Sequence, residues 1–199
     1  MGLYASMRVL AAVVRTQAGT WERKVGMVRY TLDSVRSCVW VSARSSLHPI
    51  NTETRGITGW FEAATRADGS LDLDQPVSGE LQLAVERLTS GNVLYDRELR
   101  RRIDARRHPT INGRAVQVEA AGAHPQYVMT GDISFHGKTL SFKHEMDIAV
   151  DGESVVLSGQ DDFDIREFGM KPPSMLMVRV YPEVNVRVEL YGSAGEGDT

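Results

Sequence analysis

The stretch that decides the fold is Gln126–Val150, QYVMTGDISFHGKTLSFKHEMDIAV. Apolar and polar side chains alternate along both of its arms with a period of two residues. The apolar rows are Tyr127, Met129, Ile133 and Phe135 in the first arm, and Leu140, Phe142, Met146, Ile148 and Val150 in the second. Such alternation is typical of antiparallel strands with one buried face and one solvated face. His136-Gly137-Lys138 joins the two arms. It is suited to a tight hairpin turn, because glycine allows the positive φ that such a turn requires.

The same pattern of strand, turn and strand recurs along most of the chain. We expect further strands at Val28–Asp33, Ser37–Ala43, Thr54–Phe61, Gly79–Leu88, Thr110–Ala120, Val155–Ile165, Met175–Tyr181 and Val184–Leu190, with a turn at Pro182. Each strand has one apolar face, and all of these faces must be buried together. The sequence therefore predicts an all-β protein, and we expect about eight of these segments to form the wall of an eight-stranded antiparallel up-and-down barrel.

A change of period predicts one short helix near residues 95–107. Leu99 and Ile103 are four residues apart, and Tyr95 extends their narrow apolar edge. Six arginines lie in this segment. We interpret them as a solvated helix face with intrahelical ion pairs, and the alternative is a cationic patch for anionic lipid head groups. No aromatic side chains interleave the arginines, which argues against nucleic acid as a partner.

Composition indicates an ordinary globular protein with one large domain. The 199 residues are 42% hydrophobic and 25% charged, with a formal net charge of -3, so the overall charge gives no reason to expect nucleic acid. The single cysteine, Cys38, cannot form an internal disulfide and does not indicate a compartment. No stretch approaches the ~20 apolar residues of a transmembrane helix.

Both ends of the chain are expected to lie outside the barrel, which we place at residues 27–191. Leu10–Val14 is a short apolar run, and Arg15 follows it directly, unlike a signal peptide. We therefore expect a cytoplasmic protein, with export as the alternative. Residues 1–26 are interpreted as a disordered extension, an early start codon before Met27, or an amphipathic helix docked on the barrel. Residues 192–199 are small and polar, and we expect them to be a disordered tail.

Candidate catalytic groups are few. The five histidines are not at zinc-ligand spacing, and the chain has no nucleophile elbow and no phosphate-binding loop. His144 lies in an apolar row, either as a contact to a ligand head group or as a core histidine bonded to a neighbour. Asp161 lies in the inward row of its strand and needs a partner there. Arg166 is either a contact for a ligand head at the barrel mouth or a surface ion pair with Asp164 or Glu167. We expect a protein that is not an enzyme.

Several segments, taken in order, resemble the YceI-like family of lipid-binding proteins. These segments are Ser37–Ser42 with Trp40, Gly59-Trp60-Phe61, Thr89-Ser90-Gly91-Asn92 with Asp96 and Leu99, His108-Pro109-Thr110-Ile111, Tyr127–Gly137, Asp164–Gly169 and the closing valine-rich strand. The resemblance covers about Val28–Tyr191. It departs from the family pattern after Ile111, where Asn112-Gly113-Arg114 replaces an aromatic residue and a strand-forming run.

The resemblance implies an extended lipocalin-like barrel that holds a polyisoprenoid or an isoprenoid quinone. The apolar pattern alone fits a ligand tunnel and a filled core equally well, and the resemblance favours the tunnel. We expect no cofactor other than this lipid, and the resemblance also suggests a homodimer. The expected ligand-binding residues are Trp40, Phe61, Leu83, Met129, Phe135, Phe142, His144, Met146, Phe163, Arg166 and Met177.

We therefore predict that the protein carries or sequesters a lipophilic small molecule. One alternative is an interaction module with a filled core that uses the arginine-rich helix or an open barrel edge. The other is an enzyme acting on a lipophilic substrate, with His144 and Asp161 as acid and base. That alternative requires the two side chains to lie within hydrogen-bonding distance inside the barrel.

Overall fold

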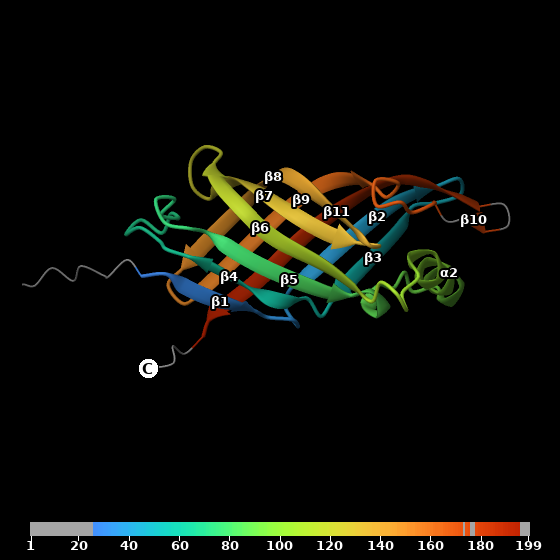
Figure 1. Cartoon of the computed structure of the whole chain (residues 1–199), viewed down its shortest axis with the longest axis horizontal. Coiled ribbons are helices and arrows are strands. Elements are labelled where there is room, and N and C mark those ends of the chain that lie inside the picture. The colour runs from blue at the N-terminus through green and yellow to red at the C-terminus, as the bar shows by residue number, and fades with distance from the viewer. Residues whose placement is uncertain (1–25, 173, 176–177, 196–199) are drawn as a thin grey trace, which may run out of the picture.

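The computed structural model describes residues 26–172, 174–175 and 178–195, and its strands form a closed antiparallel barrel (Figure 1). The eight barrel strands are β1 (Val28–Leu32), β4 (Thr58–Ala63), β5 (Ser78–Ala84), β6 (Thr110–Ala120), β7 (Gln126–Phe135), β8 (Lys138–Asp151), β9 (Ser154–Asp164) and β11 (Val178–Ala194). Each pairs with the next in this order, and β11 pairs back with β1 to close the ring. The predicted eight-stranded antiparallel barrel is confirmed.

A second hairpin extends the wall beside β11. Its strands are β2 (Cys38–Ser45) and β3 (Ile50–Arg55), and β2 pairs with β11 beyond the part of β11 that meets β1. Within the described ranges β3 pairs with β2 alone. The two-residue strand β10 (Ser174–Met175) pairs with the start of β11.

The strand predicted at Thr54–Phe61 is wrong, because the chain turns in its middle. Gly56 has a φ of 91°, and its N–H donates to the carbonyl of Ser34 at 2.9 Å. This turn separates β3 from β4, which run along different parts of the barrel. A positive φ is readily adopted by glycine, so Gly56 is suited to this break.

The predicted turn at Pro182 is also wrong, since β11 runs through it. The register of β11 against β2 shifts between Val180 and Val184, and a bulge of this kind tolerates a proline that cannot donate to the ladder. At its far end β11 continues to Ala194, which pairs with Tyr30 of β1. The barrel therefore ends later than Tyr191, and the tail that we expected from Gly192 is partly strand. Residues 196–199 and most of the predicted extension, 1–26, lie outside the described residues.

The described part of the chain contains one α-helix, α2 (Val93–Ile103), where we expected residues 95–107. It begins earlier because the Asn92 side chain accepts hydrogen bonds from two N–H groups of the first turn. It ends earlier because Asp104 adopts the left-handed conformation, with a φ of 50°. Glu98 accepts hydrogen bonds from Arg101 and Arg102, which holds the pKa of its carboxyl at about 2.

The barrel interior contains two separate clusters of buried side chains. The larger cluster fills one half of the barrel and includes Tyr30, Leu32, Ile57, Phe61, Ala63, Leu71, Leu83, Tyr127, Ile148, Val155, Leu157 and Leu190. The smaller cluster consists of Val85, Ile103, Phe168 and Met170. Ile103 belongs to α2, which lies at one end of the molecule (Figure 1). The space between these clusters is the candidate site.

Candidate functional site

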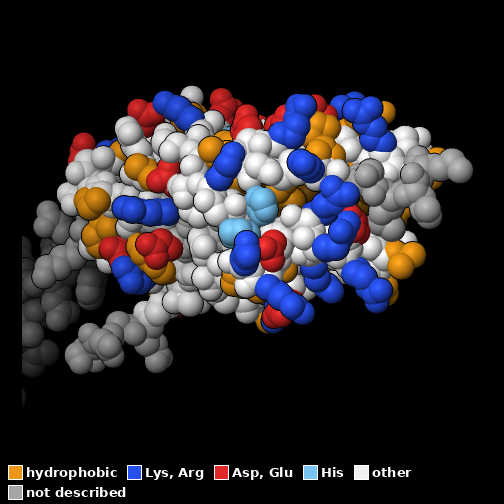
Figure 2. All heavy atoms as spheres, turned by 45° about the vertical axis from the view of Figure 1, so that its right-hand side comes forward, with side chains coloured by type: hydrophobic (Ala, Val, Ile, Leu, Met, Phe, Trp, Pro, Cys, Tyr) orange, Lys and Arg blue, Asp and Glu red, His pale blue; other side chains and the backbone are white. Residues whose placement is uncertain are grey.

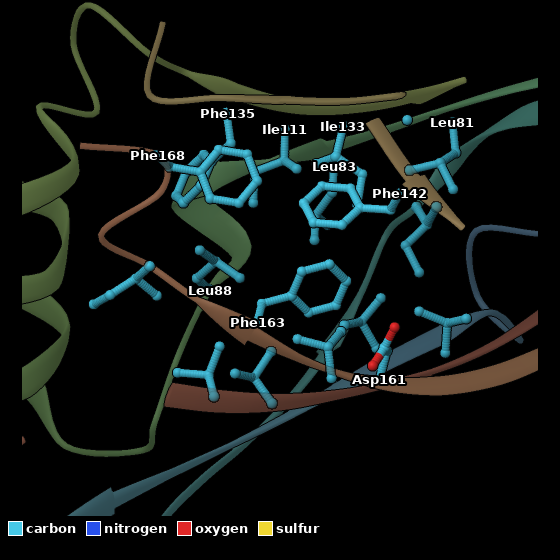
Figure 3. Close-up of a pocket in the computed structure, with 18 of the residues that line it drawn as sticks. Leu81, Leu83, Leu88, Ile111, Ile133, Phe135, Phe142, Asp161, Phe163 and Phe168 are labelled. Atoms are coloured by element: carbon cyan, nitrogen blue, oxygen red, sulfur yellow. The ribbon is translucent and has the colours of Figure 1, made fainter. Parts of the chain in front are cut away.

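The barrel encloses a cavity of about 460 Å³. This volume lies within the range of roughly 300–1,000 Å³ that is usual for small-molecule sites. Figure 3 shows its apolar wall, in which Phe142 and Phe163 project towards each other and Leu88 and Phe168 lie near α2. The wall continues onto Leu99 of α2, so the cavity reaches the α2 end of the barrel.

A row of small residues explains why this part of the barrel is hollow. Five neighbours lie side by side across β4 to β8: Phe61, Gly79, Ala115, Gly131 and Phe142. Directly opposite residues of an antiparallel sheet face the same side, and all five line the cavity. The three middle positions carry at most a methyl group, so no long side chain from them enters the space between the two phenylalanines.

One polar pair lies within this apolar wall. β8 and β9 pair through Met146 and Gly159, and two residues further along the pair are His144 and Asp161, on the same inward face. Nδ1 of His144 contacts Oδ2 of Asp161. Strand register therefore brings together two residues that are seventeen positions apart in the chain. The carboxyl group of Asp161 is visible among the apolar side chains in Figure 3.

Aromatic rings surround the polar pair. The Phe142 ring stacks on the imidazole of His144, with ring centroids 5.4 Å apart and an interplanar angle of 20°. The Phe163 ring meets both of them edge to face, at 4.8 Å from Phe142 and 5.4 Å from His144. These contacts hold the imidazole in one orientation.

The environment of His144 favours its neutral form. Burial lowers the pKa of His144 below its ordinary value, because the charged imidazolium loses solvation. Apart from the Asp161 contact, no described group hydrogen-bonds to either ring nitrogen. A neutral imidazole with its proton on Nδ1 donates to the Asp161 carboxylate, and the pair then carries one negative charge.

The structure brings together eight of the eleven residues that we predicted to bind the ligand. They line the cavity and are Phe61, Leu83, Met129, Phe135, Phe142, His144, Met146 and Phe163. Phe61 and Leu83 also belong to the larger buried cluster, so they lie where the cavity meets the filled half. Met177 lies outside the described residues.

Trp40 and Arg166 are not in the cavity wall. Trp40 lies on the outer face of β2, where the guanidinium of Arg187 is 3.9 Å from the centroid of its ring, and its neighbour Val39 faces the cavity instead. Arg166 donates to Asp164 at 2.9 Å, so its alternative interpretation as a surface ion pair is the one that the structure shows. Trp40 was predicted to bind the ligand, but the guanidinium over its partly exposed ring stabilises the outward position.

Several cavity-lining residues were missing from the predicted set. Ile133, Val184, Val186 and Val188 lie in rows that alternation already placed inward, and Asp161 was considered as an acid–base partner of His144 but not as a ligand contact. Phe168 lies in the turn after β9, where no periodicity could have indicated its direction.

The face at the α2 end is mixed in charge rather than apolar. Figure 2 shows lysine and arginine side chains spread over this face, with acidic groups among them and histidine side chains near its centre. No helix in the described ranges has the length and apolar character needed to cross a membrane. Nor do the described His, Cys, Asp and Glu residues form a group of three or more suited to a metal ion.

Comparison with known proteins gives one family and several related folds. The sequence profile described as YceI-like domain matches residues 30–191. The structure of Burkholderia cenocepacia BcnA is 16% identical with a TM-score of 0.67, and the match covers 80% of this chain and 98% of that one. The structure of a polyisoprenoid binding domain from Saccharophagus degradans is 9% identical with a TM-score of 0.63, and the match covers 84% of this chain and 99% of that one.

A third similar structure is the Campylobacter jejuni YCEI protein. It is 12% identical with a TM-score of 0.57, and the match covers 74% of this chain and 86% of that one. At these identities the structural likeness shows a shared fold. No curated protein matches the chain significantly.

Proposed function

Because the chain belongs to the YceI-like family and its barrel encloses an apolar cavity, we propose that it binds a long lipophilic ligand, a polyisoprenoid or an isoprenoid quinone. Its role is that of a carrier or a sequestering protein. The observation that carries this proposal is the hollow half of the barrel, whose accessible wall surface is almost entirely apolar. The similar fold of the polyisoprenoid binding domain from Saccharophagus degradans supports the same class of ligand.

The physical chemistry of the wall suits such a ligand. Transfer of apolar surface from water stabilises a complex by roughly 25 cal/mol per Å², so a prenyl chain gains affinity from contact area alone. Met129 and Met146 line the cavity, and their flexible thioethers adapt to the irregular outline of a branched chain. Binding of this kind needs few polar contacts.

The contact between His144 and Asp161 favours a second candidate, an enzyme acting on a lipophilic substrate. It meets the geometric requirement for an acid and a base in one site. We propose binding rather than catalysis, because the cavity wall already accounts for lipid retention and binding requires no reacting group. The two candidates differ in whether the protein releases the lipid unchanged or chemically altered.

Native mass spectrometry of the purified full chain, followed by organic extraction, tests both candidates. We expect a discrete added mass that extracts as an isoprenoid lipid, and an offered polyprenol or quinone that is recovered unchanged. Recovery of a chemically altered lipid would instead support the enzyme. Bare protein that takes up neither a polyprenol nor a quinone would overturn the binding proposal.

A further inference from the structure

The inward rows beside the cavity contain an unexpected carboxylate. In β8, β9 and β11 these rows are apolar except for His144 and Asp161. Opposite Asp161 on β11 is Val186, which offers it no hydrogen bond from its side chain. A filled or purely hydrocarbon-binding barrel gains nothing from a carboxylate here, since apolar neighbours offer its oxygens no hydrogen bond.

The groups that contact Asp161 occupy only some of the hydrogen-bond acceptor sites of its carboxylate. Oδ1 accepts a hydrogen bond from the N–H of Asp162 at 2.7 Å, and Oδ2 contacts Nδ1 of His144. A carboxylate has about four acceptor sites, so further donors can be accommodated. The Asp161 side chain is 41% exposed although it lines the cavity, so its oxygens are accessible to an incoming group.

The cations of the cavity wall do not neutralise Asp161 in this structure. Arg102 lies at the α2 end and donates to Glu98 at 2.6 Å. Arg114 belongs to the outward row of β6. A polar group that approaches Asp161 from the cavity therefore meets a negative charge beside the imidazole of His144, which the rings of Phe142 and Phe163 hold in place.

This arrangement discriminates between lipid head groups. A hydroxyl or an ammonium group donates a hydrogen bond to the carboxylate, and an ammonium also gains from the opposite charge. The carboxylate of a fatty acid is repelled by Asp161, and a hydrocarbon leaves it without a further donor. We infer that the cavity selects amphiphiles whose polar end donates a hydrogen bond, a long-chain alcohol or amine, with Asp161 as the acceptor and His144 as its positioning partner. The inference rests on the proposed lipid-binding function.

A farnesyl series tests the inference on the full-length protein. The probes are farnesol, farnesylamine, farnesoic acid and farnesene, which share an isoprenoid chain and differ in the head group. Their affinities are measured by displacement of a fluorescent lipid. We expect farnesol and farnesylamine to bind about tenfold more tightly than farnesoic acid, which corresponds to about 1.4 kcal/mol.

Two variants at Asp161 and one neighbouring control complete the experiment. Asp161→Asn removes the charge and should reduce the preference over farnesoic acid to about twofold, and Asp161→Leu should bind farnesene more tightly than the wild type does. Asp162→Asn is the matched control, because Asp162 lies next in β9 on the outer face and accepts from Asn185 at 2.8 Å. It should keep the wild-type preference.

The outcomes separate this inference from the proposed function. Equal binding of all four probes, or an unchanged preference in Asp161→Asn, would overturn head-group selection and leave lipid binding intact. Failure of every probe to bind, farnesene included, would overturn both. A larger loss for farnesylamine than for farnesol in Asp161→Asn would identify the charged amine as the better-matched class and support the inference.

Discussion

The two halves of the barrel have the same strands and the same alternation but different interiors. In the filled half, defined by the cluster around Tyr30 and Ile148, these two side chains are fully buried. In the cavity half, defined by the wall around Phe142 and Phe163, inward side chains keep accessible surface. Ile148 and Phe142 belong to the same inward row of β8. Alternation therefore decides which side chains point into the barrel. It does not decide whether those side chains pack against one another across the interior.

The glycines show how the difference arises. A Cβ placed at Gly192, in the filled half, would lie 2.9 Å from a methyl of Val155 and 3.2 Å from Cβ of Tyr30, so neighbours already occupy that space. A Cβ placed at Gly131, in the cavity half, would lie 2.9 Å from the backbone carbonyl oxygen of Arg114, and its nearest neighbours include no side-chain atom. A small residue leaves a cavity only where larger neighbouring side chains do not fill the space beside it.

The largest expected effect compares two isoleucines, one in each half. Ile148→Ala should lower the free energy of unfolding by about 2–5 kcal/mol, because it removes contacts from a close-packed cluster. Ile133→Ala should cost about 1 kcal/mol, since Ile133 already borders a cavity and loses fewer contacts. Urea unfolding measures both, and equal m-values would confirm that the unfolded states are comparable. Equal losses would mean that the cavity half is as tightly packed as the filled half.

A second comparison enlarges one alanine in each half. Ala63 is fully buried, and Ala63→Leu should cost about 1–3 kcal/mol through overpacking. Ala115 lies in the row of small residues, so Ala115→Leu has room and should leave stability within about 0.5 kcal/mol of the wild type. The same substitution should weaken lipid binding, because the new side chain occupies ligand space. Tight lipid binding by Ala115→Leu would place the ligand elsewhere.

A third test asks whether the α2 end can be destabilised without a change in the filled half. Asp96 is buried, and it accepts hydrogen bonds from Thr89 Oγ1 at 2.8 Å and from the N–H and Oγ of Ser90, both at 2.7 Å. Burial by itself raises the pKa of Asp96, but these hydrogen bonds outweigh it and hold the pKa below its ordinary value. Asp96→Asn should cost about 1–2 kcal/mol and increase hydrogen exchange in α2, with little change in β1 and β8.

The sign of the pH dependence follows from the lowered pKa. Ionised Asp96 stabilises the folded protein fully above its unfolded pKa, which is about 3.9, and this contribution is lost as the pH falls through the lower folded value. The difference in unfolding free energy between wild type and Asp96→Asn should therefore shrink below about pH 4. A difference that does not depend on pH would show that charge at Asp96 is not the stabilising feature.

Periodicity alone determined much of the fold. The inward rows of β7, β8 and β11 follow directly from it, and the turn between β7 and β8 follows from His136-Gly137, which both have positive φ. Other features depend on tertiary contacts that a sequence does not display. Pro182 lies inside β11 only because a bulge accommodates it. The position of Phe168 depends on packing beneath α2.

The wall of the candidate site was predictable from the sequence, whereas the contact between His144 and Asp161 could be raised only as the requirement of one alternative. Rows of apolar residues indicated eight cavity-lining positions, but a filled core has the same rows. The pairing of His144 with Asp161 depends on the register between β8 and β9, which alternation leaves free to shift by two residues. Strand β2 shows the limit most clearly, because both of its faces are partly apolar, and alternation therefore does not indicate that Val39 rather than Trp40 faces the cavity.

The prediction with the smallest expected effect concerns the outer face of β2, where the structure places Trp40. Trp40→Leu removes a ring that lies beneath the guanidinium of Arg187, which should cost about 0.5–1 kcal/mol of stability at this partly exposed site. Lipid affinity should stay within about twofold of the wild type, because the ring is outside the cavity. Phe163→Leu is the matched cavity variant, and it should weaken lipid binding more, since its ring lies in the wall. Comparable losses of affinity in the two variants would mean that the outer face of β2 also contacts the lipid, and that the two faces of this strand are not functionally distinct.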